Sequence, residues 1–160
     1  MSKQDHTQYL RKGDKFIAYK SHQGQKTQRP HIVFLHGLYS DMEGSKCLFL
    51  HKKCQQSDFS FTRFDNYGHG ESSGEFSECT MTSWQEGADD IINNITGDIL
   101  LIGSSMGGWL ALNSAIKHDK VKSLLLIAPA PDFTENLMWQ KFSVQERQIL
   151  IEEGVLKKND

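Results

Sequence analysis

The stretch that decides the fold is Ile99–Trp109, which reads ILLIGSSMGGW. Its first four residues are apolar and suit a strand that is buried on both faces of a parallel sheet. The small residues of Gly103–Gly108 then predict a tight turn, and Trp109–Lys117 has apolar residues at helical spacings. The sequence therefore predicts a strand, a turn and a helix in direct succession.

Strands and helices alternate on both sides of this unit. Gly-rich turns follow three of the strands, at the carboxyl ends where open parallel sheets bind ligands. The alternation indicates βαβ units, so we expect an α/β fold, a mostly parallel sheet with helices on both faces. The other expected strands are Lys15–Tyr19, Ile32–Leu35, Phe59–Phe64 and Val121–Ala128, and the other expected helices are Met42–Lys53 and Met81–Asn94, the latter capped by Thr80.

Length and charge exclude several classes of protein. The chain has 160 residues, the size of one domain, with 18 basic and 20 acidic side chains and a formal charge of −2. This near balance argues against nucleic acid as a partner, because a nucleic-acid binder needs a basic face. Apolar runs such as Leu124–Ala128 are far shorter than the ~20 residues of a membrane span.

Cysteine usage points to a reducing compartment. Cys47, Cys54 and Cys79 form no CxxC pair, so neither a disulfide framework nor a zinc site is expected. Cys47 and Cys54 lie seven residues apart on one face of an expected helix, which favours core packing. The polar Met1–Tyr9 segment lacks the apolar region of a secretory signal, and we therefore predict the cytoplasm.

Gly103-Ser104-Ser105-Met106-Gly107 has the pattern G-x-S-x-G between a strand and a helix. A nucleophilic serine at this place stands on a sharp, strained turn, and Gly103 and Gly107 prevent clashes around it. The turn also places the serine at the amino end of the next helix, whose unpaired N–H groups favour a developing oxyanion. Ser105 is the predicted nucleophile, and the Met106 backbone N–H is a predicted oxyanion donor.

A second oxyanion donor is expected from the loop after Ile32–Leu35, where His36-Gly37-Leu38 follows at once. The backbone N–H of Leu38 is the candidate, and Gly37 lets the loop approach the serine closely. No metal or organic cofactor is implied by this arrangement.

Three landmarks resemble the α/β-hydrolase superfamily, namely IVFLHGL at Ile32–Leu38, DNYGHGES at Asp65–Ser72 and GSSMGGW at Gly103–Trp109. With APAPDF at Ala128–Phe133 they span about two-thirds of the chain, in the family's order. The second and third are most similar to the small serine esterase and thioesterase branch that contains the mitochondrial palmitoyl-protein thioesterase type and its bacterial relatives. The resemblance implies that His36 is structural and supports the oxyanion loop.

Other interpretations of these residues stay open. The turn at Ser105 can use small residues for packing alone, and His36 can be a catalytic base instead of a support. A dinucleotide-binding turn fits less well, because GSSMGG lacks the middle glycine of G-x-G-x-x-G. Asp132 follows the last expected strand, where some hydrolases place the triad acid, and is a candidate for that role.

The chain departs from the superfamily where the triad base and acid are expected. In this fold the order is Ser, then Asp or Glu, then His. The only histidine after Ser105 is His118, in the helix that runs away from the nucleophile. The sequence thus resembles a hydrolase truncated after the sixth family strand, with residues 1–131 as the core and residues 132–160 as the start of a helical cap.

Three explanations of this truncation stay open: an incomplete chain, a split gene with a second polypeptide, and an inactive remnant. The first two call for a complementing C-terminal chain. The strand Val121–Ala128 becomes an unprotected sheet edge, which favours self-association. In the tail, Ser143 and Glu146 form a capping box that predicts a helix ending near Gly154.

These observations predict a serine hydrolase that cleaves small-molecule carboxylic esters or thioesters through an acyl-enzyme intermediate. The triad acid and base are expected outside this chain, so the chain alone is expected to be inactive or nearly so. The alternatives are an inactive hydrolase remnant or binding module, and a peptidase-type hydrolase on the same fold.

Overall fold

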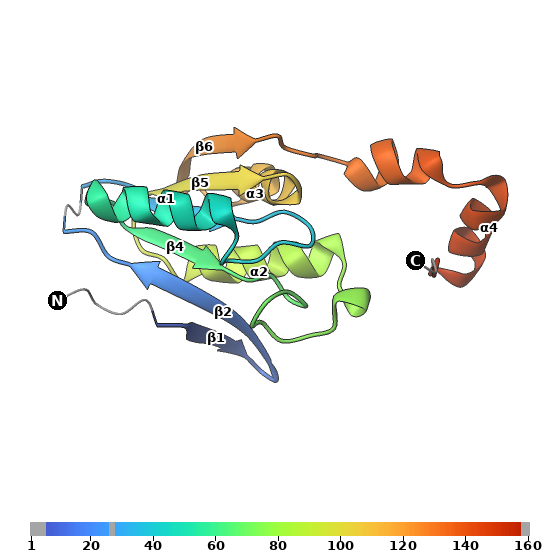
Figure 1. The fold of residues 1–160 in the computed structure, drawn as a ribbon, viewed down its shortest axis with the longest axis horizontal. Coiled ribbons are helices and arrows are strands. Elements are labelled where there is room, and N and C mark those ends of the chain that lie inside the picture. The colour runs from blue at the N-terminus through green and yellow to red at the C-terminus, as the bar shows by residue number, and fades with distance from the viewer. Residues whose placement is uncertain (1–5, 26–27, 158–160) are drawn as a thin grey trace. The chain divides into compact units, whose positions relative to one another are not determined.

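The computed structural model describes residues 6–25 and 28–157, which form two compact units that meet at the Ala130–Pro131 bond (Figure 1). The first unit holds the sheet and three helices. Its elements are β1 (Gln8–Lys12), β2 (Lys15–His22), β3 (His31–Leu35), α1 (Ser45–Gln56), β4 (Phe61–Phe64), a 3₁₀ turn (Phe76–Glu78), α2 (Met81–Asn93), β5 (Ile99–Ser104), α3 (Met106–Lys117) and β6 (Val121–Ile127).

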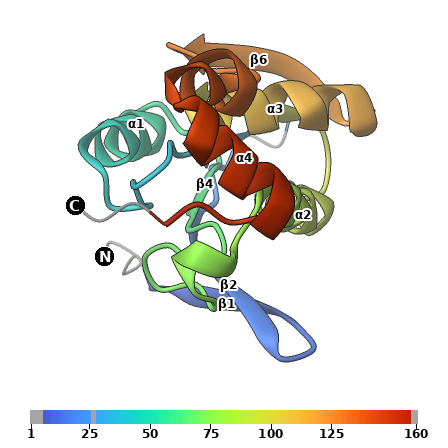
Figure 2. The same cartoon turned by 90° about the vertical axis from the view of Figure 1, so that its right-hand side faces the viewer.

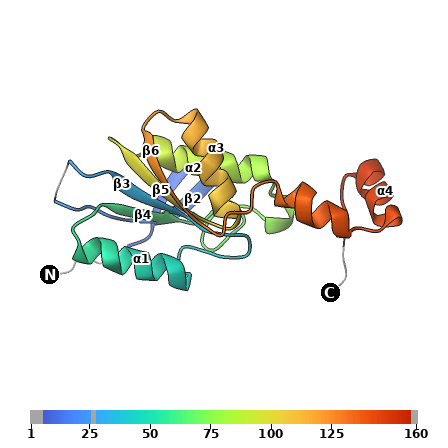
Figure 3. The same ribbon diagram turned by 90° about the horizontal axis from the view of Figure 1, so that it is seen from above.

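The described residues form one six-stranded sheet in the order β1-β2-β4-β3-β5-β6. The four strands β4, β3, β5 and β6 pair in parallel, while β2 and β1 continue the sheet in antiparallel pairings. The β1–β2 hairpin lies at one end of the sheet and β6 at the other (Figure 2). Helix α1 covers one face, and α2 and α3 cover the opposite face (Figure 3). The predicted α/β class with helices on both faces is therefore confirmed.

The centre of the sheet is buried on both faces, as the apolar runs predict. Val33, Leu35 and Leu101 are fully covered, because neighbouring strands flank β3 and β5 while helices cover both faces. On the α1 side, Cys47 and Cys54 pack in one cluster with apolar side chains of the sheet. The expectation that these two cysteines serve core packing is confirmed.

Several element boundaries differ from the predicted ones, and three of the differences have a clear structural cause. Strand β1 was not predicted, because its residues are mostly exposed and polar and it is held by pairing with β2. Helix α1 begins at Ser45 instead of Met42, since residues 41–44 form a turn. Helix α3 already begins at Met106, because tertiary packing makes its two glycines helical against their low intrinsic propensity.

One buried carboxylate ties together two of the loops at the carboxyl edge of the sheet. Asp65, at the end of β4, accepts a hydrogen bond from the Met42 backbone N–H at 2.7 Å and another from the Glu71 N–H at 2.8 Å. Burial raises the pKa of Asp65, and these two bonds oppose the rise. The loop after β3 is therefore fixed to the loop after β4, and Gly37 of the first loop lies against Ser105 at the start of α3.

The second unit, residues 131–157, is a chain of short helices. It comprises a π-helical turn (Thr134–Met138), a 3₁₀ turn (Trp139–Lys141) and α4 (Val144–Glu153). Ser143 and Glu146 form the predicted capping box, and Gly154 ends α4 with a left-handed φ of 73°. Among the described residues, no helix has both the length and the apolar character needed to cross a membrane.

The close crossing of α3 over the sheet predicts a strong dependence on Gly107. A Cβ atom there would collide with the carbonyl oxygens of Leu35 and His36, which are backbone atoms that cannot move aside. We expect Gly107→Ala to lower the free energy of unfolding by about 1–3 kcal/mol, measured by urea denaturation.

Gly87→Ala in α2 is the matched control for this change. The atoms nearest to its added Cβ would be side-chain atoms of Ile17 and Tyr67, at 3.2–3.4 Å, which can shift by a few tenths of an ångström more easily than backbone. The control should be close to neutral, since alanine also favours the helix. Equal stability of the two variants would contradict the packing argument.

Candidate active site

Ser105 is held in a strained backbone conformation between β5 and α3. Its φ of 54° and ψ of −120° lie in a region that a non-glycine residue occupies only under constraint, at a cost of about 1–3 kcal/mol. Three backbone hydrogen bonds hold it there: its N–H donates to Ile127, and its carbonyl accepts from Gly108 and from Ala130. The side chain is exposed, so the turn presents the hydroxyl to its surroundings.

The two glycines of the motif stand where neighbouring backbone leaves no room for a side chain. A Cβ at Gly103 would collide with the backbone of Gly107, and a Cβ at Gly107 would collide with the end of β3. The first turn of α3 can therefore lie directly on the strands. This close approach is what lets the chain reverse within a single residue at Ser105.

The loop after β3 packs against the serine. A Cβ built on Gly37 would lie 3.1 Å from the Ser105 Cβ and 3.7 Å from its Oγ. Any larger residue at position 37 would thus crowd the hydroxyl. The predicted close approach of Gly37 to the serine is present in the structure.

Two backbone N–H groups next to Ser105 carry no hydrogen bond. Within the described part of the chain, neither the Leu38 nor the Met106 amide has an acceptor. Met106 is the first residue of α3, where the helix supplies no partner and its dipole favours negative charge. Both amides are therefore available to a ligand atom bound beside Ser105.

His36 orients one of these amides through the neighbouring carbonyl. Its ring is buried, and Nδ1 lies 2.8 Å from the Gly37 carbonyl oxygen. The Gly37 C=O and the Leu38 N–H belong to the same trans peptide unit, so they point in opposite directions. Anchoring the carbonyl on His36 therefore turns the Leu38 N–H away from the ring.

The second ring nitrogen of His36 determines its protonation state. Nε2 accepts a hydrogen bond from the Asn66 backbone N–H at 3.1 Å, so the proton of the neutral ring is on Nδ1, where it donates to Gly37. Burial lowers the pKa of His36 to about 4, which keeps the ring neutral at pH 7. A buried, neutral histidine with both ring nitrogens engaged is consistent with a structural role, and that role of His36 stays a prediction.

The other histidines near the motif are also engaged elsewhere. His69 Nδ1 lies 3.1 Å from the Tyr67 carbonyl oxygen. His118 ends α3 and contacts the Asp89 carboxylate of α2 at 2.8 Å, so it is not paired with its sequence neighbour Asp119. Burial alone would raise the pKa of Asp89, but hydrogen bonds from Lys117 and His118 hold it below its ordinary value. These contacts join α2 to α3.

Asp132 belongs to the second unit. It has a positive φ of 51°, and its backbone carbonyl accepts hydrogen bonds from the N–H groups of Glu135 and Asn136, which begins the helical turn there. The role of Asp132 as triad acid stays a prediction. Among the described residues, no group of three or more His, Cys, Asp or Glu side chains is placed to hold a metal ion.

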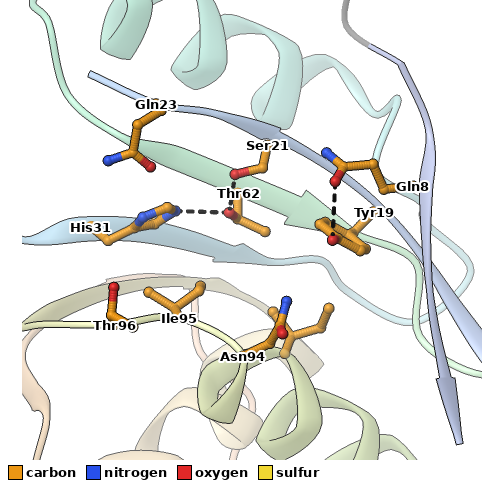
Figure 4. Close-up of a pocket in the computed structure, with 10 residues that line it drawn as sticks. Gln8, Tyr19, Ser21, Gln23, His31, Thr62, Asn94, Ile95 and Thr96 are labelled. Carbon is orange, nitrogen blue, oxygen red and sulfur yellow. Dashed lines mark hydrogen bonds between the residues drawn. The ribbon is translucent and has the colours of Figure 1, made fainter. Parts of the chain in front are cut away.

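Two cavities of similar size lie at opposite edges of the sheet. One of about 300 Å³ borders Ser105, Gly37 and Leu38 at the carboxyl edge. The other, of about 320 Å³, lies near His31 at the start of β3 (Figure 4). In the second cavity, His31 Nε2 and the Ser21 hydroxyl both contact the Thr62 hydroxyl, at 2.7 and 2.9 Å. The first cavity is the one beside the candidate nucleophile.

The fold, the strained serine and its neighbouring amides agree with the family assignment. Residues 26–154 match the family described as serine aminopeptidase, S33, so the chain belongs to this α/β-hydrolase family. It is 38% identical over 118 residues to the mitochondrial palmitoyl-protein thioesterase ABHD10 of Rattus norvegicus. That match covers 72% of this chain but 39% of the relative, so the chain spans about two-fifths of the curated relatives it matches.

Comparison with solved structures agrees with this family assignment. A protein of Agrobacterium vitis S4 described as a hydrolase has a TM-score of 0.84 and 33% identity, and the match covers 97% of this chain and 63% of that one. Mouse alpha/beta hydrolase domain-containing protein 10 has a TM-score of 0.83 and 32% identity, covering 93% and 59%. The chain is therefore similar to hydrolases over nearly its whole length.

The neutral, buried state of His36 predicts a pH dependence of stability. The pKa of His36 in the folded protein lies below the ordinary value of 6.5. The stabilisation that comes from the neutral ring is therefore fully present above pH 6.5 and is lost as the pH falls toward 4. We expect the contribution of His36 to the free energy of unfolding to fall over this pH range by on the order of 3 kcal/mol at most. Denaturant titrations at a series of pH values between 7 and 4 measure this fall in the free energy of unfolding.

A variant isolates this contribution from those of other histidines. His31, whose pKa burial also lowers to about 4, adds to the same window. His36→Gln should flatten the decline, whereas His6→Gln, at an exposed position, should leave it unchanged. An unchanged slope in His36→Gln would show that the ring is not held neutral in the folded state.

Proposed function

We propose that this chain carries the nucleophile of a serine hydrolase that cleaves carboxylic esters or thioesters through an acyl-enzyme intermediate. The observation that supports this most strongly is the exposed, strained Ser105 beside two unpaired backbone amides. A turn used only for packing would not need an exposed hydroxyl beside two free backbone donors. The names of the relatives, a thioesterase among them, favour the same chemistry.

In the proposed reaction, Ser105 Oγ attacks the acyl carbonyl carbon and loses its proton to a general base. The carbonyl oxygen becomes an oxyanion, which accepts hydrogen bonds from the N–H groups of Leu38 and Met106. The bond to the alcohol or thiol then breaks, and that group leaves with a proton. Water attacks the acyl-serine ester in the same way, which releases the carboxylic acid and restores the serine.

We propose that the general base lies outside these residues. After Ser105, the chain offers only His118, which is held by Asp89 and ends the helix that leads away from the serine. Asp132 stays the candidate acid within the chain. The family usually brings its acid and base on later strands, and among the described residues β6 is the last strand of the sheet. A complementing C-terminal segment that pairs along β6 would supply both groups, and self-association at this edge is the alternative.

Two other functions are alternatives to this proposal. The chain can be an inactive remnant or binding module, and the description of the matched family names serine aminopeptidases. A panel of acyl esters, acyl thioesters and aminoacyl amides separates the esterase and thioesterase proposal from a peptidase. The cytoplasm stays a prediction for this chain, since the relatives are named as mitochondrial proteins.

A fluorophosphonate probe tests the nucleophile directly. Without a base and an acid, oxyanion stabilisation and binding still give on the order of 10³–10⁴ over water in a comparable serine enzyme. We therefore expect slow covalent labelling of the chain at Ser105, located by mass spectrometry, and no labelling of Ser105→Ala.

Ser123→Ala, an exposed serine of β6, should be labelled like the original chain. Labelling that persists in Ser105→Ala would place the nucleophile elsewhere. Complete absence of labelling, including after addition of a C-terminal segment from a relative, would favour the inactive remnant.

A further inference from the structure

The cavity beside Ser105 has a second wall that the proposed reaction does not use. It holds about 300 Å³ between the serine and the first turn of α1. One wall consists of the oxyanion loop with Ser104 and Ser105, and the other is formed by Ser45, Lys46 and Cys47. A substrate bound with its carbonyl at Ser105 would therefore have another part of its structure against this helix end.

The first turn of α1 is open to an anion. Its N-cap is Gly44, which has no side chain to satisfy the free donors, and the helix has 12 residues. Within the described ranges, the backbone N–H groups of Ser45, Lys46 and Cys47 have no acceptor. Because the helix dipole adds partial positive charge there, an oxyanion is favoured at this end.

A buried hydroxyl facing the same cavity is an independent sign of a ligand. Ser104 is only 6% exposed, and its hydroxyl makes no hydrogen bond within residues 6–25 and 28–157. It lies two residues after Ile102 on β5, and so on the sheet face where Ile102 packs with Cys47 of α1. A buried hydroxyl usually has a partner, and this one borders the cavity.

The side chains that line the cavity include one cationic group and one carboxylate. Lys46 is the one cationic residue in the lining and makes no ion pair in the part of the chain that the structure describes. The acidic lining residue, Asp41, opposes an anion, although one of its carboxylate oxygens accepts a hydrogen bond from the Glu43 N–H at 2.8 Å, so the anion would depend on Lys46 and on the free N–H groups of α1. Burial raises the pKa of Cys47 to about 12, so its thiol stays neutral and adds no negative charge.

We propose that this cavity is a subsite for a small oxyanion group, a carboxylate or a phosphate, which the ester or thioester substrate carries near its scissile carbonyl. The proposal rests on the proposed function for its link to hydrolysis, because the subsite borders Ser105. The N–H groups of the first turn of α1, the ammonium group of Lys46 and the hydroxyl of Ser104 would hold the anion.

Binding of simple anions tests the subsite without requiring any hydrolysis. We expect inorganic phosphate or acetate, titrated into the ¹⁵N-labelled chain, to shift the amide resonances of Ser45, Lys46 and Cys47 along a saturable curve. The two anions distinguish phosphate from carboxylate as the preferred group. Lys46→Glu should weaken the binding at least tenfold, which corresponds to the loss of a charge-assisted hydrogen bond, and Ser104→Ala should weaken it less.

Lys52→Glu is the matched control, since Lys52 lies on the same helix and is exposed but does not line the cavity. It should leave the affinity within about twofold, because an exposed charge at this distance is screened. The proposal is overturned if no shift saturates, if the shifts centre on the last turn of α1, or if Lys46→Glu binds as tightly as the original chain.

The two proposals can fail separately. Saturable binding together with no fluorophosphonate labelling at Ser105 would keep the anion subsite and reject the hydrolase. Labelling at Ser105 without saturable binding would keep the hydrolase proposal and reject the anion subsite. If both hold, bound phosphate or acetate should slow the labelling of Ser105 in the original chain and not in Lys46→Glu.

Discussion

The close contact between the first turn of α3 and the end of β3 is the constraint on which the site depends. Only a residue without a side chain can stand at Gly107, because the carbonyl oxygens of Leu35 and His36 occupy the space of a Cβ. This contact forces the chain to reverse at Ser105 and gives that residue its unfavourable φ of 54°. The exposed hydroxyl, the free Met106 amide and the closeness of the loop after β3 all follow from it.

Much of this could be predicted from residue types and spacing. Apolar runs predicted the parallel strands, because burial on both faces leaves no polar positions. The pattern G-x-S-x-G predicted the turn, because small residues are required where backbones touch. The capping pair Ser143 and Glu146 predicted where α4 begins. Strand β1 could not be found, because pairing with β2 and not its own composition makes it a strand.

The residues that hold the candidate site together were harder to predict than the candidate nucleophile. That His36 anchors the Gly37 carbonyl and accepts from Asn66 depends on a contact 30 residues apart in sequence, which no local pattern reveals. The same is true of Asp65, which fixes the loop after β3 through Met42. The unpartnered hydroxyl of Ser104 was likewise hidden, since within the motif it is merely the residue between Gly103 and the nucleophile.

The most direct test of the central claim is an experimental structure of the chain after reaction with a phosphonate that mimics the tetrahedral intermediate. We predict a covalent bond to Ser105 Oγ and a phosphoryl oxygen about 2.7–3.1 Å from both the Leu38 and the Met106 backbone nitrogens. A phosphoryl oxygen that points away from both amides, or a bond to another side chain, would contradict the proposed oxyanion site.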